Sequence, residues 1–137
     1  MREVLPGLLW IGNARDTRAF REMLSAGITA IVDLAMEEPP TQPPRDIICC
    51  RFPLIDGEGN PPALLRIVVQ TTASLIRSGL PNLVACGGGM SRSPAVVAGA
   101  MASVRTASID RMLQDVTKNG PHDVSPAFWS ELQQAVS

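Results

Sequence analysis

A run of apolar and neutral residues from Leu80 to Cys86 passes into three glycines and then into a stretch with helical periodicity. A short run of this composition is typical of a strand that is buried on both faces of a sheet. Pro94 suits the first turn of the helix that follows, and the small apolar residues up to Val104 suit close packing against a sheet. A buried strand that turns tightly into a helix is a building unit of α/β folds, so this segment predicts that fold class.

The rest of the chain shows the same alternation of short apolar runs and longer periodic stretches. We expect further strands at residues 8–11, 28–34 and 47–54. Helices are expected to begin at Asp16 or Thr17, at Pro61–Pro62, at Ser108 and at Ser125–Pro126, with Gly27, Gly79 and Gly120 ending the first three of these. Residues 37–44 hold four prolines, which predicts a surface loop. The expected architecture is one α/β domain over residues 1–137, with a mostly parallel central sheet and helices on both faces.

Composition narrows the function classes. The 137 residues are 45% hydrophobic and 18% charged, which is ordinary for a compact domain. The net charge is -1 and there is no block of basic residues, which disfavours nucleic-acid binding. No apolar run approaches the ~20 residues that span a bilayer, and the N-terminus lacks the apolar stretch of a signal peptide, so we expect a cytoplasmic protein without a membrane partner. The three cysteines have the spacing of neither a disulfide framework nor a zinc site, which favours reduced thiols.

The glycine-rich turn carries the residues of a phosphate site. Cys86 is a nucleophile only as the thiolate, and a helix N-terminus, backbone N–H groups and the Arg92 guanidinium all stabilise that form. Glycines let successive N–H groups point inward and form a concave site for a dianionic phosphate. The planar fork of Arg92 can bind two phosphate oxygens at once. The residues predicted to bind the phosphate are Gly87, Gly88, Gly89, Met90, Ser91 and Arg92.

Hydrolysis through a cysteine also needs an acid that protonates the departing oxygen. Our candidate is Asp56, which follows the expected strand at 47–54, and Glu58 is the second choice. Gly57 and Gly59 on either side would let this loop move.

Cys86, Arg92 and the hydroxyl of Ser93, with Gly89 three residues after the cysteine, resemble the signature of the protein tyrosine phosphatase superfamily. The chain length and the segments 9–14 and 27–29 resemble its dual-specificity branch in particular. The resemblance implies the phosphatase fold and an acid at the position of Asp56. It also implies that Ser93 donates a hydrogen bond to the sulfur and helps it leave from a phosphocysteine intermediate. No metal or cofactor is implied.

The sequence departs from the family pattern at two places. Ala85 stands where the family usually has histidine, which predicts an altered pH dependence rather than loss of activity. Gly120–Pro121 stands where the family often has Arg-Pro before the last helix.

The loop from Gly87 to Ser91 also lacks the lysines that relatives acting on phosphoinositides usually carry. The short chain predicts a shallow pocket that accepts phosphoserine, phosphothreonine and phosphotyrosine of protein substrates.

Three other functions remain open at this stage. A catalytically silent module would bind phosphorylated partners without turnover, which Ala85 makes plausible and the retention of Cys86, Arg92 and Asp56 together disfavours. An RNA 5'-phosphatase would need a basic groove, and a sulfur transferase would not need Asp56. The sequence does not specify an oligomeric state.

Four other residues have alternative roles. Cys49 and Cys50 could form a reversible disulfide with Cys86, but two buried thiols in an apolar strand are the stronger interpretation. The only histidine, His122, is expected at the surface without a metal role. Asp33 could line the cleft, although capping a turn before the proline-rich loop is the preferred role.

Overall fold

The computed structural model describes residues 1–137 and contains a five-stranded sheet. Its strands are β1 (Arg2–Leu5), β2 (Leu9–Asn13), β3 (Ala30–Ala35), β4 (Ile48–Leu54) and β5 (Asn82–Cys86), in the spatial order β1-β2-β5-β3-β4. All neighbouring pairs are parallel except β1 and β2, which are antiparallel. The predicted α/β fold with a mostly parallel sheet is therefore confirmed, with one antiparallel strand that makes the sheet mixed.

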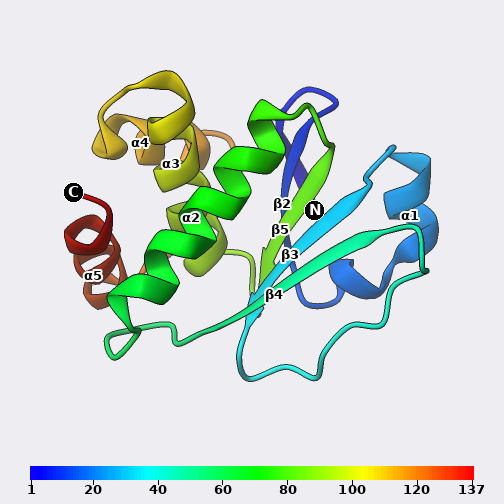
Figure 1. The fold of residues 1–137 in the computed structure, drawn as a ribbon, viewed down its shortest axis with the longest axis horizontal. Coiled ribbons are helices and arrows are strands. Elements are labelled where there is room, and N and C mark those ends of the chain that lie inside the picture. The colour runs from blue at the N-terminus through cyan, green and yellow to red at the C-terminus, as the bar shows by residue number, and fades with distance from the viewer.

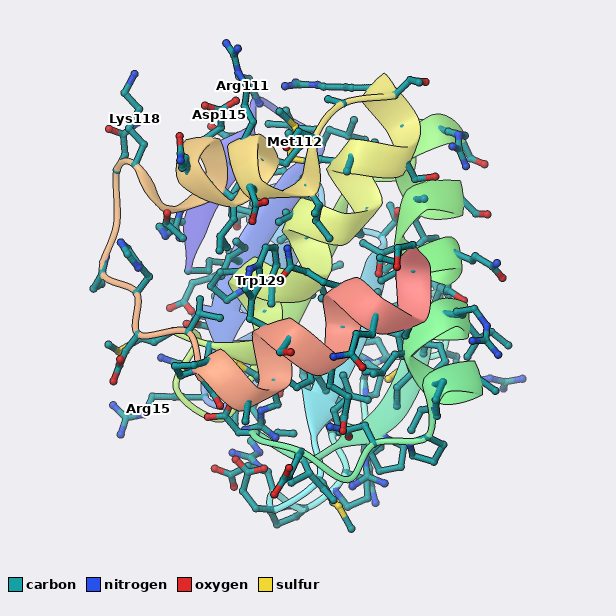
Figure 2. The ribbon with its side chains drawn as sticks, turned by 90° about the vertical axis from the view of Figure 1, so that its left-hand side faces the viewer. Arg15, Arg111, Met112, Asp115, Lys118 and Trp129 are labelled. Atoms are coloured by element: carbon teal, nitrogen blue, oxygen red, sulfur yellow. The ribbon has the colours of Figure 1, made fainter.

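Helices cover both faces of this sheet. A 3-10 turn (Asp16–Arg18) and the short α1 (Phe20–Ser25) lie on one face. The other face carries α2 (Pro62–Arg77), α3 (Arg92–Arg105), α4 (Ile109–Thr117) and α5 (Pro126–Val136), and Figure 1 shows this group on the opposite side of the strands from α1. Within the group, α4 packs against α3, and α5 packs against both α2 and α3; Figure 2 shows Met112 on α4 and Trp129 on α5. No helix is both long and apolar enough to cross a membrane.

The two faces bury unequal cores, because successive side chains of a strand point to opposite sides. Val84 and Cys86 of β5 belong to a cluster of 25 buried residues under α2, α3, α4 and α5. Leu83 and Ala85 of the same strand belong to a cluster of 7 on the side of α1. The larger cluster therefore supports the strand and the helix between which the predicted phosphate loop lies.

Some predicted element ends were wrong. Neither Asp16 nor Thr17 caps α1, which has Ala19 at its N-cap and no side-chain cap. Instead, an Asp16 carboxylate oxygen accepts from the Asn13 N–H, and the Thr17 hydroxyl donates to the Ala14 carbonyl. These local bonds close the 3-10 turn and delay the start of the helix.

The end of α4 also differs from the prediction, and Gly120 has a different role from the one expected. This helix ends at Thr117, before Gly120, whereas Gly27 and Gly79 have the positive φ angles of +83° and +69° expected of helix-ending glycines. A Cβ atom at Gly120 would collide with the guanidinium of Arg2. Arg2 lies on β1, a strand that the sequence analysis did not predict, and its Nη1 donates to the Val116 carbonyl at 2.8 Å. Gly120 thus makes room for a side chain from the other end of the chain.

Candidate active site

Cys86 is the last residue of β5, the central strand, and is 2% exposed. Parallel strands β2 and β3 flank it on both sides. Residues 87–91 form the loop that follows, and α3 begins at Arg92. The loop therefore lies at the carboxyl edge of a parallel sheet and at a helix N-terminus, where α/β proteins bind anions.

Backbone contacts fix this loop on two sides. The Gly87 carbonyl accepts from the Ala14 N–H at 3.2 Å, and the Met90 carbonyl accepts from the Asp123 N–H at 2.8 Å. Gly89 has a φ of +73°, and a Cβ atom there would lie 2.8 Å from the Gly12 carbonyl oxygen. Glycine is required at position 89 for both reasons.

Some donors of the Arg92 guanidinium make hydrogen bonds within the protein, and others have no partner. Nη1 donates to the Leu54 carbonyl at 2.8 Å and to the Glu37 carboxylate at 2.7 Å, and Nη2 donates to the other Glu37 oxygen at 2.6 Å. Nε is buried and has no hydrogen-bond partner. Since Glu37 occupies the end of the fork, the edge made by Nε and Nη2 keeps its donors for a ligand.

Glu37 is a site residue that the sequence analysis missed, because it falls at the start of the proline-rich loop. Its carboxylate occupies the space next to Gly87, where a Cβ atom would collide with it. The hydrogen bonds from Arg92 hold the pKa of Glu37 below its usual range. Burial alone lowers the pKa of Arg92, but Glu37 and the charges of Cys86 and Asp56 offset it, so the pKa of Arg92 is raised. The guanidinium is thereby kept charged and correctly oriented.

Asp56 lies near the loop and makes one side-chain hydrogen bond to it. Its Oδ1 accepts from the Ser91 hydroxyl at 2.6 Å, and that hydroxyl in turn accepts from the Ser125 N–H at 2.9 Å. Asp56 is exposed, whereas Ser91 is buried. Ser91 therefore joins three segments: the phosphate loop, the segment after β4 and the start of α5.

The loop that carries Asp56 is fastened at its far end. The buried Asn60 exchanges hydrogen bonds with the backbone of Ile55, at 2.8 and 3.0 Å. The Glu131 carboxylate of α5 accepts from the N–H groups of Gly59 and Asn60, both at 2.8 Å. Although Gly57 and Gly59 suggested a mobile loop, these bonds hold its second half to α5.

A small open pocket of about 160 Å³ brings these groups together. It is lined by Asp56, Cys86, Gly88, Met90, Ser91, Arg92 and Asp123. Asp123, which the sequence analysis also missed, reaches the pocket because its N–H bonds to Met90. The Ser93 hydroxyl is fully buried in α3 and has no hydrogen-bond partner, so its predicted contact with sulfur stays a prediction.

Cys49 and Cys50 do not reach Cys86. Cys50 pairs with Val32 of β3, which pairs with Val84 of β5. Two strand spacings separate Cys50 from β5 by roughly 10 Å, whereas disulfide-bonded Cα atoms lie within about 7 Å. Partial burial raises the pKa of both thiols. Cys49 is exposed and Cys50 is half-buried, so the expectation of two buried thiols was wrong.

The remaining candidates also lie outside the pocket. Asp33 is buried within β3 beside Ala85, and its Oδ1 accepts from the Ala35 N–H at 3.3 Å, at an irregularity of the strand rather than in a turn before the proline-rich loop. Burial raises the pKa of Asp33, and the Ala35 N–H and Arg51 offset part of that shift. His122 and Glu58 are exposed.

The comparison with curated proteins identifies the family. The chain is 33% identical to mouse dual specificity phosphatase 28 over 130 residues, which cover 92% of this chain and 78% of the relative. The human protein of the same name is 31% identical over 130 residues, covering 92% and 72%. This chain belongs to the dual-specificity phosphatases.

Solved structures agree with that assignment. The crystal structure of human DUSP28 matches this dual-specificity phosphatase with a TM-score of 0.85 and 28% identity, over 99% of this chain and 95% of that one. A mouse putative dual specificity phosphatase, solved as a complex with zinc tungstate, matches with a TM-score of 0.83 and 30% identity, over 97% and 84%. No family model matches the chain.

Proposed function

We propose that this dual-specificity phosphatase hydrolyses phosphate monoesters on proteins through a phosphocysteine intermediate. The observation that carries the proposal is the arrangement of Arg92, which lines the same pocket as Cys86 and Asp56, has its end fixed by Glu37 and keeps a buried Nε without a hydrogen-bond partner. An unsatisfied buried donor is costly unless a ligand completes it. A phosphate oxygen supplies the missing acceptor.

The proposed mechanism uses the side chains that line this pocket. The Cys86 thiolate attacks phosphorus, and the bond from phosphorus to the leaving oxygen breaks as Asp56 gives that oxygen a proton. Arg92 and the loop N–H groups of residues 87–91 stabilise the equatorial oxygens in the transition state. Water, deprotonated by the Asp56 carboxylate, then attacks phosphorus and releases the thiolate. The unpartnered Ser93 hydroxyl would donate to the sulfur as it leaves.

The charges around the pocket favour a singly phosphorylated group on a protein. Asp56 and Asp123 both line the pocket, and the loop between Gly87 and Ser91 has no lysine. Additional phosphates on a substrate would meet these carboxylates without a compensating cation. The small volume of the open pocket, about 160 Å³, supports phosphoserine and phosphothreonine as substrates beside phosphotyrosine. Because a thiolate nucleophile must stay reduced, the proposal includes a cytoplasmic location.

The relative solved with zinc tungstate gives further support, since tungstate is a tetrahedral oxyanion like phosphate. The test is hydrolysis of para-nitrophenyl phosphate by the purified protein in the presence of a chelator, beside Cys86→Ser. We expect turnover that vanishes in Cys86→Ser and is inhibited by vanadate. Vanadate binding without any turnover would contradict the proposal and favour a silent phosphate-binding module.

A further inference from the structure

Ser91 stands at the N-cap of α3 but does not cap the helix. An N-cap serine normally accepts a hydrogen bond from a backbone N–H of the first turn. Ser108 and Ser125 do so at the starts of α4 and α5, accepting from Arg111 and Phe128. The Ser91 side chain makes no such bond, and this leaves the first N–H groups of α3 free for a phosphate.

The direction of each Ser91 hydrogen bond is fixed by its partners. The Ser125 N–H can only donate, so the Ser91 oxygen accepts from it at 2.9 Å. The single hydroxyl proton is left for Asp56 Oδ1, which lies at 2.6 Å. In this arrangement Asp56 Oδ1 is an acceptor, so it leaves Oδ2 as the oxygen that can carry a proton.

We propose that the Ser91 hydroxyl determines which oxygen of Asp56 carries the catalytic proton. With Oδ1 engaged as an acceptor, the acid proton sits on Oδ2, which makes no hydrogen bond with the protein. Oδ2 passes this proton to the leaving oxygen as the bond to phosphorus breaks, and later takes a proton from the water that attacks the phosphocysteine. The Ser91 hydroxyl touches no reacting atom, and through it Ser91 is a positioning residue for Asp56.

This role predicts a dependence on the leaving group. An acid matters most when the leaving oxygen is strongly basic and least when it is weakly basic. In Ser91→Ala we expect kcat/KM for phenyl phosphate to fall roughly 10- to 100-fold, the loss expected for a hydrogen bond to a charged group. For a substrate with a much more acidic phenol, such as difluoromethylumbelliferyl phosphate, we expect a loss below about threefold.

Two controls separate positioning from a structural effect. Ser108→Ala removes an N-cap serine far from the pocket and should lower the melting temperature without changing the ratio of the two kcat/KM values. Ser91→Thr keeps the hydroxyl and should keep that ratio within about threefold of the parent protein. If Ser91→Ala does not fold, Ser91→Thr still tests the proposal through this ratio, and a changed ratio overturns it.

A double-mutant cycle gives the sharpest test. In the Asp56→Asn background, Ser91→Ala should change kcat/KM for phenyl phosphate by less than about threefold, because the acid is already missing. Equal losses of Ser91→Ala on both substrates, or losses that multiply with those of Asp56→Asn, would overturn the proposal. The inference rests on the proposed phosphatase function. If the parent protein shows no turnover that depends on Cys86, the proposed phosphatase function is wrong. If the parent is active but the variants show equal losses on both substrates, only the role of Ser91 is wrong.

Discussion

Arg92 and Asp56 face the same pocket, but the protein holds them in different ways. Arg92 is 4% exposed and is fixed by three hydrogen bonds between 2.6 and 2.8 Å, to Glu37 and the Leu54 carbonyl. Asp56 is exposed and its carboxylate makes one hydrogen bond, to the Ser91 hydroxyl. The proposed phosphate clamp is thus formed before substrate binds, whereas the proposed acid keeps one oxygen free of hydrogen bonds with the protein.

This difference matches the role proposed for each group. The clamp stabilises charge on the phosphate oxygens best if it needs no reorganisation during the reaction. The acid must give up a proton in one step and take one back in the next, so it needs an oxygen that the protein does not bind. The three short hydrogen bonds of Arg92 satisfy the first requirement, and the single hydrogen bond from Ser91 to Asp56 satisfies the second.

The largest loss is expected from the clamp. Arg92→Lys replaces a fork with a point charge, and we expect kcat/KM for para-nitrophenyl phosphate to fall about 1000-fold. Arg66→Lys, an exposed change on α2, is the matched control and should have little effect. An Arg92→Lys enzyme within about tenfold of the parent would show that the fork is not needed.

A smaller and substrate-dependent loss is expected from the acid. Asp56→Asn should lower kcat for phenyl phosphate roughly 100-fold or more, and much less for a substrate with an acidic phenol. If Glu58→Asn gave this pattern and Asp56→Asn did not, the assignment of the acid would be wrong.

Removing the partner of Arg92 should lower kcat/KM less than replacing Arg92 itself. In Glu37→Gln we expect kcat/KM to fall by up to about 100-fold, because the Arg92 fork loses its orienting partner. Glu38→Gln, next along the chain and paired with the exposed Arg18 at 3.8 Å, should change little. Equal effects of the two variants would show that Glu37 acts only through the general charge of the loop.

The Glu37 pair also has a defined pH dependence. Because the pKa of Glu37 is lowered in the folded protein, its contribution to stability is present above the unfolded pKa of about 4.3 and is lost as the pH falls through the folded pKa. The difference in melting temperature between the parent and Glu37→Gln should therefore shrink on acidification. A difference that grew towards low pH would contradict the ion pair.

The smallest effect is expected at Asp33, outside the pocket. Burial raises its pKa, so the ionised carboxylate destabilises the fold as the pH rises through the folded pKa. Asp33→Asn keeps an acceptor for the Ala35 N–H and should raise the melting temperature slightly at neutral pH, with the gain vanishing near pH 4 or below. Thermal melts at several pH values test this, and a destabilised Asp33→Asn protein at neutral pH would count against it.

The sequence was informative where local chemistry determines structure. The apolar run before Cys86, the glycines after it and the proline-led helices each follow from short-range preferences, and the fold class was confirmed. Glu37, Asp123 and strand β1 could not be found in that way. Glu37 reaches Arg92 across 55 residues and Arg2 reaches Val116 across 114, so only the folded chain shows what these residues contact.

The most direct test of the central claim is to trap the phosphocysteine. Asp56→Asn, mixed with para-nitrophenyl phosphate and quenched rapidly in acid, should contain a protein species heavier by one phosphoryl group, with the group on Cys86 by peptide mass spectrometry. The same treatment of Cys86→Ser should leave the mass unchanged. Turnover without any covalent species on Cys86 in repeated rapid-quench experiments would contradict a cysteine-dependent mechanism for this chain.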